Sequence, residues 1–213
     1  QITNDLKPEE RLKLLKEAVN ENLHNNILAY WASRTPDNVN GGFVGRINSN
    51  NEVVPDAFKG GILNARILWT WSAAYRVTKN PEYLKLATRA KDYILNHFID
   101  KEFGGAYFSL TAAGEPLSDR KHTYTEAFFI YGLAEYSRAT GDRETLEAAK
   151  KIFSIFEDKI HDKEAGGYFE IFSREWERTS NSPTGSRQGN DQKTMNTSLH
   201  IMEAFANLYR VWP

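Results

Sequence analysis

The chain has 213 residues, of which 40% are hydrophobic and 13% aromatic, enough for a substantial core within one large domain. Its 27 Lys and Arg residues nearly balance 28 Asp and Glu residues, and no basic cluster predicts a nucleic-acid or membrane face. The absence of cysteine excludes disulfides, iron–sulfur clusters and thiolate zinc sites. Without an apolar run long enough for a membrane span or a signal peptide, the sequence predicts a soluble, cytoplasmic protein with neither nucleic-acid nor membrane partners.

Helical patterns of two kinds alternate along the chain. From Pro8 to about Ala32 an apolar residue recurs every three or four positions, and proline suits the first turn of a helix. The stripe consists of Leu12, Leu15, Val19, Leu23, Ile27 and Trp31. The next segment, Gly61 to Val77, is apolar almost all round, which predicts burial on most faces. Asn80 to Phe98 again carries a single apolar stripe.

The same alternation continues in the second half of the chain. Thr125 to Ala139 is mostly apolar, Asp142 to Ile160 is striped and charged, and Thr194 to Trp212 is again mostly apolar. The sequence therefore predicts three amphipathic outer helices, each followed by a buried inner helix.

Three similar glycine turns separate the outer helices from the inner ones. They are "PDNVNGGFVGRI" at 36–47, "DKEFGGAYFSL" at 100–110 and "DKEAGGYFEIF" at 162–172. The glycine pairs begin at 41, 104 and 166, so they recur at intervals of 63 and 62 residues. The glycines permit positive φ, and the β-favouring residues after them suit a short hairpin. This period predicts stacked helical hairpins with a short extended excursion at one rim.

An insertion interrupts the third repeat. Residues 173–193, "SREWERTSNSPTGSRQGNDQK", are rich in Ser, Asn, Gly and Pro and predict a long loop on the turn side. The loop is interpreted either as a lid over an active site or as a tolerated surface insertion.

Polar residues near the starts of the inner helices are the candidate site. Arg66 lies inside the most apolar helix, Tyr124 and Glu126 open the second inner helix, and Asn196 and His200 share one face of the third. Each also has an ordinary structural explanation: an ion pair, helix-start chemistry or a core histidine. If the inner helices run parallel around an axis, however, these side chains meet at one end of it. Such a polar cup suits a neutral polyol, with aromatic residues available to stack on sugar rings.

Four segments carry a family resemblance. "GGFVGRI", "KGGILNARILWTWSAAYR", "RKHTYTEAFFIYGLAEYSRATGD" and "MNTSLHIMEAFANLYRVWP" closely resemble cellobiose 2-epimerases of the N-acylglucosamine 2-epimerase superfamily, and the resemblance runs from about Leu12 to the end. It implies an all-α fold, the (α/α)6 barrel. It also implies epimerisation at C2 of the reducing-end glucose of β-1,4-linked disaccharides, without metal or nucleotide. Cellobiose would give glucosyl-mannose, and lactose would give epilactose.

The resemblance also implies roles for the candidate residues. Arg66 would stabilise negative charge on a cis-enediolate, while Tyr124, Asn196 and His200 would hold the ring-opened sugar. We therefore assign Arg66 and His200 as catalytic and Tyr124, Asn196 and Glu126 as substrate-binding. No metal ligand is assigned.

The sequence accounts for half of such a barrel. Residues 1–213 contain three of six hairpins and are interpreted as one domain, the N-terminal half. Proton exchange at C2 needs an acid and a base, a role that suits histidine. His200 is the only well-placed candidate, since the others lie on or beside outer helices or at a helix start: His24, His97, His122 and His161. In the resembled family the two acid/base histidines lie in the second half. The same chain or a second chain would supply that half, and the isolated 213-residue chain is predicted to have little or no activity.

Two other function classes stay open at this point. A six-hairpin glycoside hydrolase would use carboxylates such as Asp119 or Glu126 as acid and base. A non-catalytic helical-repeat binding module predicts instead that Arg66 and His200 pair with neighbouring protein groups and face no open cavity.

Overall fold

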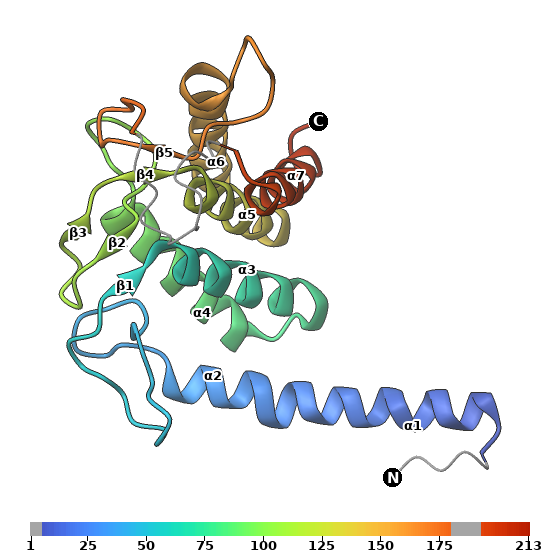
Figure 1. Cartoon of the computed structure of the whole chain (residues 1–213). Helices are drawn as coiled ribbons and strands as arrows, with labels where there is room; N and C mark the ends of the chain where they lie inside the picture. The colour runs from blue at the N-terminus through green and yellow to red at the C-terminus, as the bar shows by residue number, and fades with distance from the viewer. Residues whose placement is uncertain (1–5, 180–192) are drawn as a thin grey trace.

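The computed structural model describes residues 6–179 and 193–213, which form three helical hairpins with short strands at one rim (Figure 1). The first outer helix is continuous and comprises α1 (Pro8–Glu21), the π-helical segment η1 (Asn22–Leu28) and α2 (Ala29–Arg34). The inner helix α3 (Gly61–Thr78) follows. Most of the predicted 173–193 loop consists of residues 180–192, which lie outside the described residues. The two interpretations of this loop, a lid or a surface insertion, therefore both stay predictions.

The second and third repeats follow the same order. Outer helix α4 (Pro81–Tyr93) continues into η2 (Ile94–Phe98) and precedes inner helix α5 (Thr123–Thr140). Outer helix α6 (Arg143–Ile155) continues into η3 (Phe156–Ile160) and precedes inner helix α7 (Met195–Tyr209). The π-helical segments were not predicted, because apolar spacing does not distinguish one extra residue in a turn from regular helix.

Short, capped connections join each inner helix to the next outer helix. Lys79 and Gly141 end α3 and α5 in the left-handed conformation. The next residues, Asn80 and Asp142, cap α4 and α6 by accepting hydrogen bonds from the backbone N–H groups of Glu82 and Thr145. These caps turn the chain back on itself within two residues.

The rim consists of two small antiparallel sheets. One has the order β1–β2–β3, from Lys59–Gly60, Ser109–Leu110 and Pro116–Ser118. The other pairs β4 (Lys121–His122) with β5 (Ile171–Phe172). All six glycines of the three Gly–Gly pairs have positive φ, as expected. At Gly42 a side chain is also excluded by space, because its Cβ would lie 2.6 Å from the Tyr93 ring.

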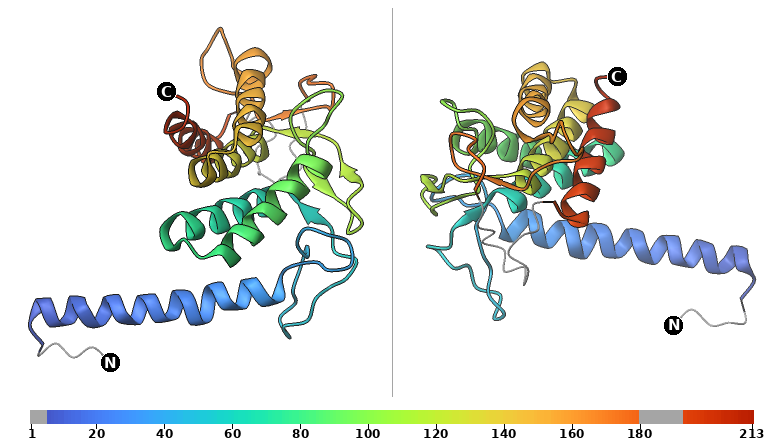
Figure 2. Two further views of the ribbon diagram at one scale, coloured as in Figure 1. Left: turned by 180° about the vertical axis from the view of Figure 1, so that it is seen from behind. Right: turned by 45° about the horizontal axis from the view of Figure 1, so that its top comes forward.

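Helix α5 is the centre of the packing. It packs against α3, α6 and α7, and α3 packs in turn against α4, so the inner helices form a row backed by the outer ones (Figure 2). Phe129 and Leu133 of α5 and Leu68 of α3 have no exposed surface. Each inner helix begins at the rim that carries the strands, which brings the starts of α3, α5 and α7 to the same end of the molecule.

The two ends of the row are uncovered. Helix α1 extends away from the other helices, and none of its residues is buried. The apolar stripe that predicted this helix is exposed at Leu12, Leu15, Val19, Leu23, Ile27 and Trp31. At the other end, α7 exposes Met195, Leu199 and Met202. Within the described ranges, no helix combines the length and apolarity that a bilayer crossing requires.

Candidate active site

Arg66 lies on the face of α3 that is turned toward α5. Its guanidinium carbon lies 4.9 Å from the centre of the Phe128 ring, a cation–π contact, and no ion pair to a carboxylate accompanies it among the described residues. Its place in the most apolar helix suggested a buried guanidinium, but the side chain is exposed on the open face of the inner row. The guanidinium keeps its hydrogen-bond donors free for an oxygen-rich ligand.

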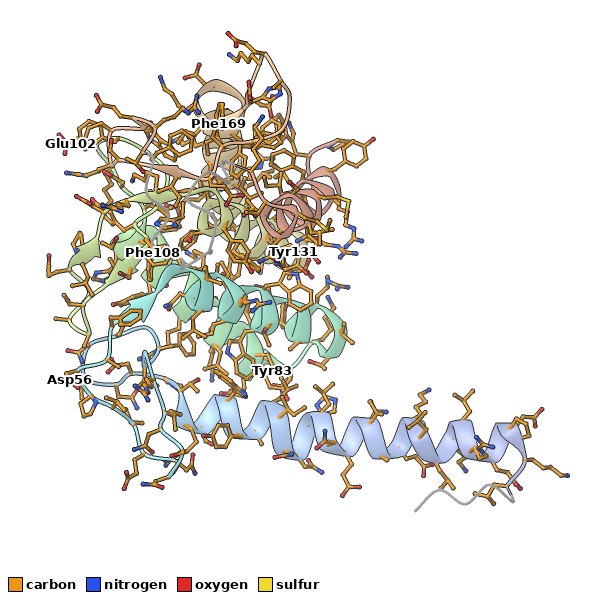
Figure 3. The ribbon with its side chains drawn as sticks, in the orientation of Figure 1. Asp56, Tyr83, Glu102, Phe108, Tyr131 and Phe169 are labelled. Carbon is orange, nitrogen blue, oxygen red and sulfur yellow. The ribbon has the colours of Figure 1, made fainter. Side chains whose placement is uncertain are left out.

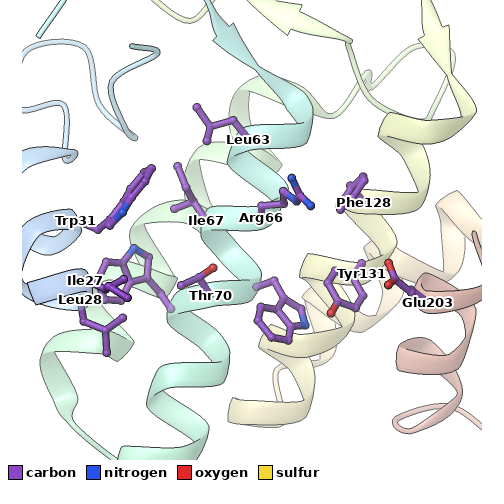
Figure 4. Close-up of a pocket in the computed structure, with 12 residues that line it drawn as sticks. Ile27, Leu28, Trp31, Leu63, Arg66, Ile67, Thr70, Phe128, Tyr131 and Glu203 are labelled. Atoms are coloured by element: carbon purple, nitrogen blue, oxygen red, sulfur yellow. The ribbon is translucent and has the colours of Figure 1, made fainter. Parts of the chain in front are cut away.

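A cavity of about 510 Å³ borders this arginine (Figure 4). Helices α3 and α5 form its walls with Leu63, Ile67, Phe128 and Tyr131, and the first outer helix closes one side. Figure 4 shows Arg66 pointing toward Phe128, with Tyr131 and Glu203 beyond it on the same side. The volume is in the usual range for small-molecule sites, and the lining is apolar with a few charged groups.

His200 joins the same cluster from α7. Its ring lies edge-on to Tyr124 at 4.8 Å and tilted against Phe128 at 4.7 Å, measured between ring centroids. Its Nδ1 lies 2.8 Å from the Glu203 carboxylate, one turn further along the helix. The aromatic rings flank the imidazole, and the contact with Glu203 favours a proton on Nδ1, which in a neutral ring leaves Nε2 as the acceptor.

The structure thus brings together three of the five predicted site residues and places a fourth beside them. Arg66, Tyr124 and His200 all contact Phe128. Asn196 is exposed in the first turn of α7, one turn before His200.

Glu126 lies apart from this cluster. Its side chain is fully buried, and both carboxylate oxygens accept hydrogen bonds from the backbone N–H of Ala106, at 2.9 and 3.1 Å. Burial raises the pKa of Glu126 to about 8, although the Ala106 hydrogen bond opposes the shift. The structure therefore uses Glu126 to hold the second glycine turn onto α5, and a buried position below a turn does not fit the substrate-binding role expected from the sequence.

The remaining histidines lie outside the cluster, and each of them is buried or half-buried. His122 is buried, stacks on Phe108 at 4.1 Å and has its pKa lowered to about 4, mainly by desolvation. His97 is half-buried and stacks on Tyr93 at 4.4 Å. His24 and His161 are likewise half-buried.

Sequence reasoning missed several residues of the site. Phe128 is the residue that Arg66, Tyr124 and His200 all contact. Trp69 stacks in parallel on Tyr131, which is labelled in Figure 3, with the ring centroids 5.3 Å apart. Glu203 follows His200 by three residues, a spacing that places both on one helix face and was available from the sequence. Phe128 and Tyr131 carried no such signal, since aromatic residues in an apolar helix are usually core.

The arrangement can bind a polyol and stabilise an oxyanion. Arg66 offers charged donors, His200 offers a polarised imidazole, and the stacked aromatic rings offer flat apolar faces for a sugar. A second acid/base group facing His200 is not found among the described residues of this cluster.

Comparison with known proteins decides the family. Residues 41–210 match the N-acylglucosamine 2-epimerase (GlcNAc 2-epimerase) family. The chain belongs to this family.

Individual members of the N-acylglucosamine 2-epimerase family align along most of this chain. The cellobiose 2-epimerase of Bacteroides fragilis is 48% identical over 200 residues, which are 94% of this chain and 51% of that protein. A cellobiose 2-epimerase of Ruminococcus albus is 38% identical over 192 residues, 90% of this chain and 49% of that protein. The chain spans about half the length of the curated relatives it matches.

Solved structures agree with the fold. The cellobiose 2-epimerase from Bacillus thermoamylovorans aligns with a TM-score of 0.90 at 38% identity, covering 94% of this chain and 51% of that one. A D-mannose isomerase aligns with a TM-score of 0.75 at 18% identity, covering 91% of this chain and 48% of that one. A family 76 glycoside hydrolase from Bacteroides thetaiotaomicron aligns with a TM-score of 0.62 at 16% identity, covering 92% of this chain and 44% of that one. The last two share the fold alone. The predicted all-α fold, part of an (α/α)6 barrel, is confirmed.

Proposed function

We propose that the protein to which this chain contributes epimerises C2 of the reducing-end glucose in β-1,4-linked disaccharides, cellobiose first and lactose second. The observation that carries the proposal is the convergence of Arg66, Tyr124 and His200 around Phe128 beside an open cavity. The similarity to the Bacteroides fragilis cellobiose 2-epimerase supports the choice of substrate.

The chemistry requires a proton to leave and return at C2. After ring opening, a base removes the C2 proton, the electron pair moves into a C1–C2 double bond, and the carbonyl oxygen becomes part of a cis-enediolate. An acid then returns a proton to the other face of C2 and restores the C1 carbonyl. Arg66 stabilises the developing negative charge, because it lines the cavity and pairs with no carboxylate among the described residues. His200 and Asn196 hold the sugar oxygens, and Tyr124 fixes the imidazole from the side.

A second half of the barrel completes this site. Its inner helices would cover the exposed apolar faces of α1 and α7, and its histidines would face His200 across the cavity. That half comes from the same chain or from a second one. The isolated chain then contributes the substrate-binding face, with little turnover of its own.

The glycoside hydrolase alternative receives less support. Glu126 is buried below a glycine turn, and Asp119 is exposed in the segment before β4. Neither lines the cavity beside Arg66, and among the described residues Glu203 is the one carboxylate in that lining, so the described lining offers no carboxylate pair for acid/base hydrolysis.

The test is proton exchange measured by NMR. The protein in its complete length is incubated with cellobiose in D₂O, and epimerisation predicts deuterium at C2 together with a mannose-type reducing end. The isolated 213-residue chain, run as a parallel sample, should show neither. Release of glucose without C2 exchange would support a hydrolase and overturn the proposal. Arg66→Lys keeps the charge but loses the planar fork, so a drop in exchange rate with this variant would tie the reaction to the site described.

A further inference from the structure

One polar contact occurs in the same form at all three glycine turns. Each turn begins with an aspartate, and a lysine placed two residues before the next inner helix reaches back to that carboxylate. We call these three contacts the Asp–Lys clamps. They are Asp37–Lys59, Asp100–Lys121 and Asp162–Lys193.

The clamps share their detailed geometry. In each, one carboxylate oxygen accepts hydrogen bonds from the backbone N–H groups two and three residues further on, and the other oxygen faces the lysine. The Lys Nζ lies 2.9, 2.8 and 2.5 Å from that second oxygen, in chain order. In the first and third clamps the lysine also donates to the carbonyl oxygen of the first glycine, Gly41 or Gly166. Every clamp therefore fastens the start of an inner helix to the turn before it.

Burial distinguishes the third clamp from the other two. The side chains of Lys121 and Asp100 are both fully buried, and Arg174 adds a second cation to that aspartate at 2.9 Å. Lys59 and Asp37 are nearly as enclosed. Lys193 and Asp162, in contrast, keep 31% and 13% of their side-chain surface exposed. A charge pair in water contributes little to the stability of a fold, whereas breaking a buried pair leaves an uncompensated charge.

Helix α7, which the third clamp fastens, is held more firmly at its C-terminal half than at its start. It packs on α5, and Phe205 in its second half contacts Phe153 and Phe156. Its first half exposes Met195, Leu199 and Met202. At its start, Glu170 accepts hydrogen bonds from the Thr194 N–H and the Thr197 hydroxyl. Lys193 and Glu170 together set where the first turn of α7 begins, and Asn196 and His200 lie within the next two turns.

We propose that Lys193 and Asp162 are positioning residues, which set the place of Asn196 and His200 in the site while contributing little to the stability of the fold. Their use in catalysis rests on the proposed function. Lys121 and Asp100 share the carboxylate geometry of the third clamp but are fully buried and serve the fold, so they provide a control within the chain. Loss of the third clamp shifts the imidazole relative to Tyr124 and Phe128, and a displacement of about 1 Å in such a site lowers kcat/KM by up to about 100-fold.

The experiment compares Lys193→Met, Lys193→Arg and Lys121→Met. Imidazole signals are recorded by NMR on the 213-residue chain, with His200 assigned from a His200→Gln spectrum, and thermal unfolding is recorded on the same samples. Lys193→Met should move or broaden the His200 signal and leave the melting temperature nearly unchanged. His161 adjoins Asp162 and should respond as well, while His24, His97 and His122 should keep their positions. Lys193→Arg should restore the His200 signal. Lys121→Met should lower the melting temperature strongly.

Two results would overturn the proposal. One is an unchanged His200 signal in Lys193→Met. The other is a fall in melting temperature as large as that of Lys121→Met, which would make the third clamp another fold-stabilising pair. Neither measurement uses a substrate. A His200 shift in a protein whose complete form lacks epimerase activity would therefore support the positioning role while the proposed function failed.

Discussion

Helices α1 and α5 show how differently two correctly predicted helices can be used. Of the 18 residues of α5, 13 are buried, whereas none of the 14 residues of α1 is. Both carry regularly spaced apolar residues, but α5 lies among three other helices and α1 has almost none beside it. Apolar spacing therefore predicts which face of a helix is able to be buried, and only the neighbouring elements determine whether it is.

The largest expected effect contrasts these two helices directly. Leu133→Ala in α5 removes a side chain with no exposed surface and should destabilise the chain by about 4 kcal/mol, from lost burial plus a cavity. Leu15→Ala in α1 removes a half-exposed side chain and should change the free energy of unfolding by less than about 0.5 kcal/mol. Urea unfolding of both variants measures the difference. Equal losses would mean that α1 is covered in solution, for instance by a second copy of the chain.

The next effect contrasts a buried ion pair with an exposed one. Lys121→Met leaves the Asp100 carboxylate with Arg174 alone, and we expect a loss of about 3 kcal/mol, the lower end for breaking a buried pair. Lys85→Met removes an exposed pair to Glu82 on α4 and should cost less than about 0.5 kcal/mol. Chemical denaturation at neutral pH tests both. A small loss for Lys121→Met would show that Arg174 replaces it fully.

The third prediction concerns the pH dependence of stability. Burial raises the pKa of Glu126 from its ordinary 4.5 to about 8, so the folded state keeps a proton that the unfolded state has lost. The contribution of Glu126 is therefore fully present below about pH 4.5, and it declines as the pH rises toward 8. Glu126→Gln, a neutral isostere, should flatten the stability profile between pH 6.5 and 8.

The choice of that pH range separates Glu126 from His122. The pKa of His122 is lowered from 6.5 to about 4 by burial, so its contribution is lost as the pH falls below 6.5. Denaturation midpoints measured at several pH values above 6.5 therefore report the stability contribution of Glu126 without that of His122. A wild-type profile that rises from pH 6.5 to 8, or is already flat there, would contradict the prediction.

A small effect on stability is expected at the site itself. Arg66→Met should change the free energy of unfolding by less than about 1 kcal/mol, since the guanidinium is exposed and its recorded contact is with the Phe128 ring. The same variant should abolish C2 exchange in the complete protein, measured by deuterium incorporation into cellobiose. Thermal unfolding provides the control. A large loss of stability would mean that Arg66 supports the packing of α3 on α5 rather than a ligand.

The sequence predicted that most of the candidate residues gather at one end of the inner row, though not their contacts. The spacing of the inner helices correctly placed Arg66, Tyr124 and His200 at one end of the row, because a regular period fixes which helix starts share a rim. It placed Glu126 with them as well, yet Glu126 turns away to bind Ala106. Tyr124 and Glu126 differ by two positions on one helix and so point in different directions, and only the packed neighbours decide which direction faces the cavity.

Local sequence is enough to predict the repeat of three outer helices, three inner helices and three glycine turns with positive φ. These features depend on local chemistry, namely apolar spacing, capping residues and the conformational freedom of glycine. Packing of the hairpins is needed to show that Phe128 links the candidate residues and that a lysine before each inner helix fastens the preceding turn. It is also needed to show that α1 and one face of α7 are exposed. Those outcomes depend on side chains far apart in sequence, and their contacts form only when the hairpins pack together.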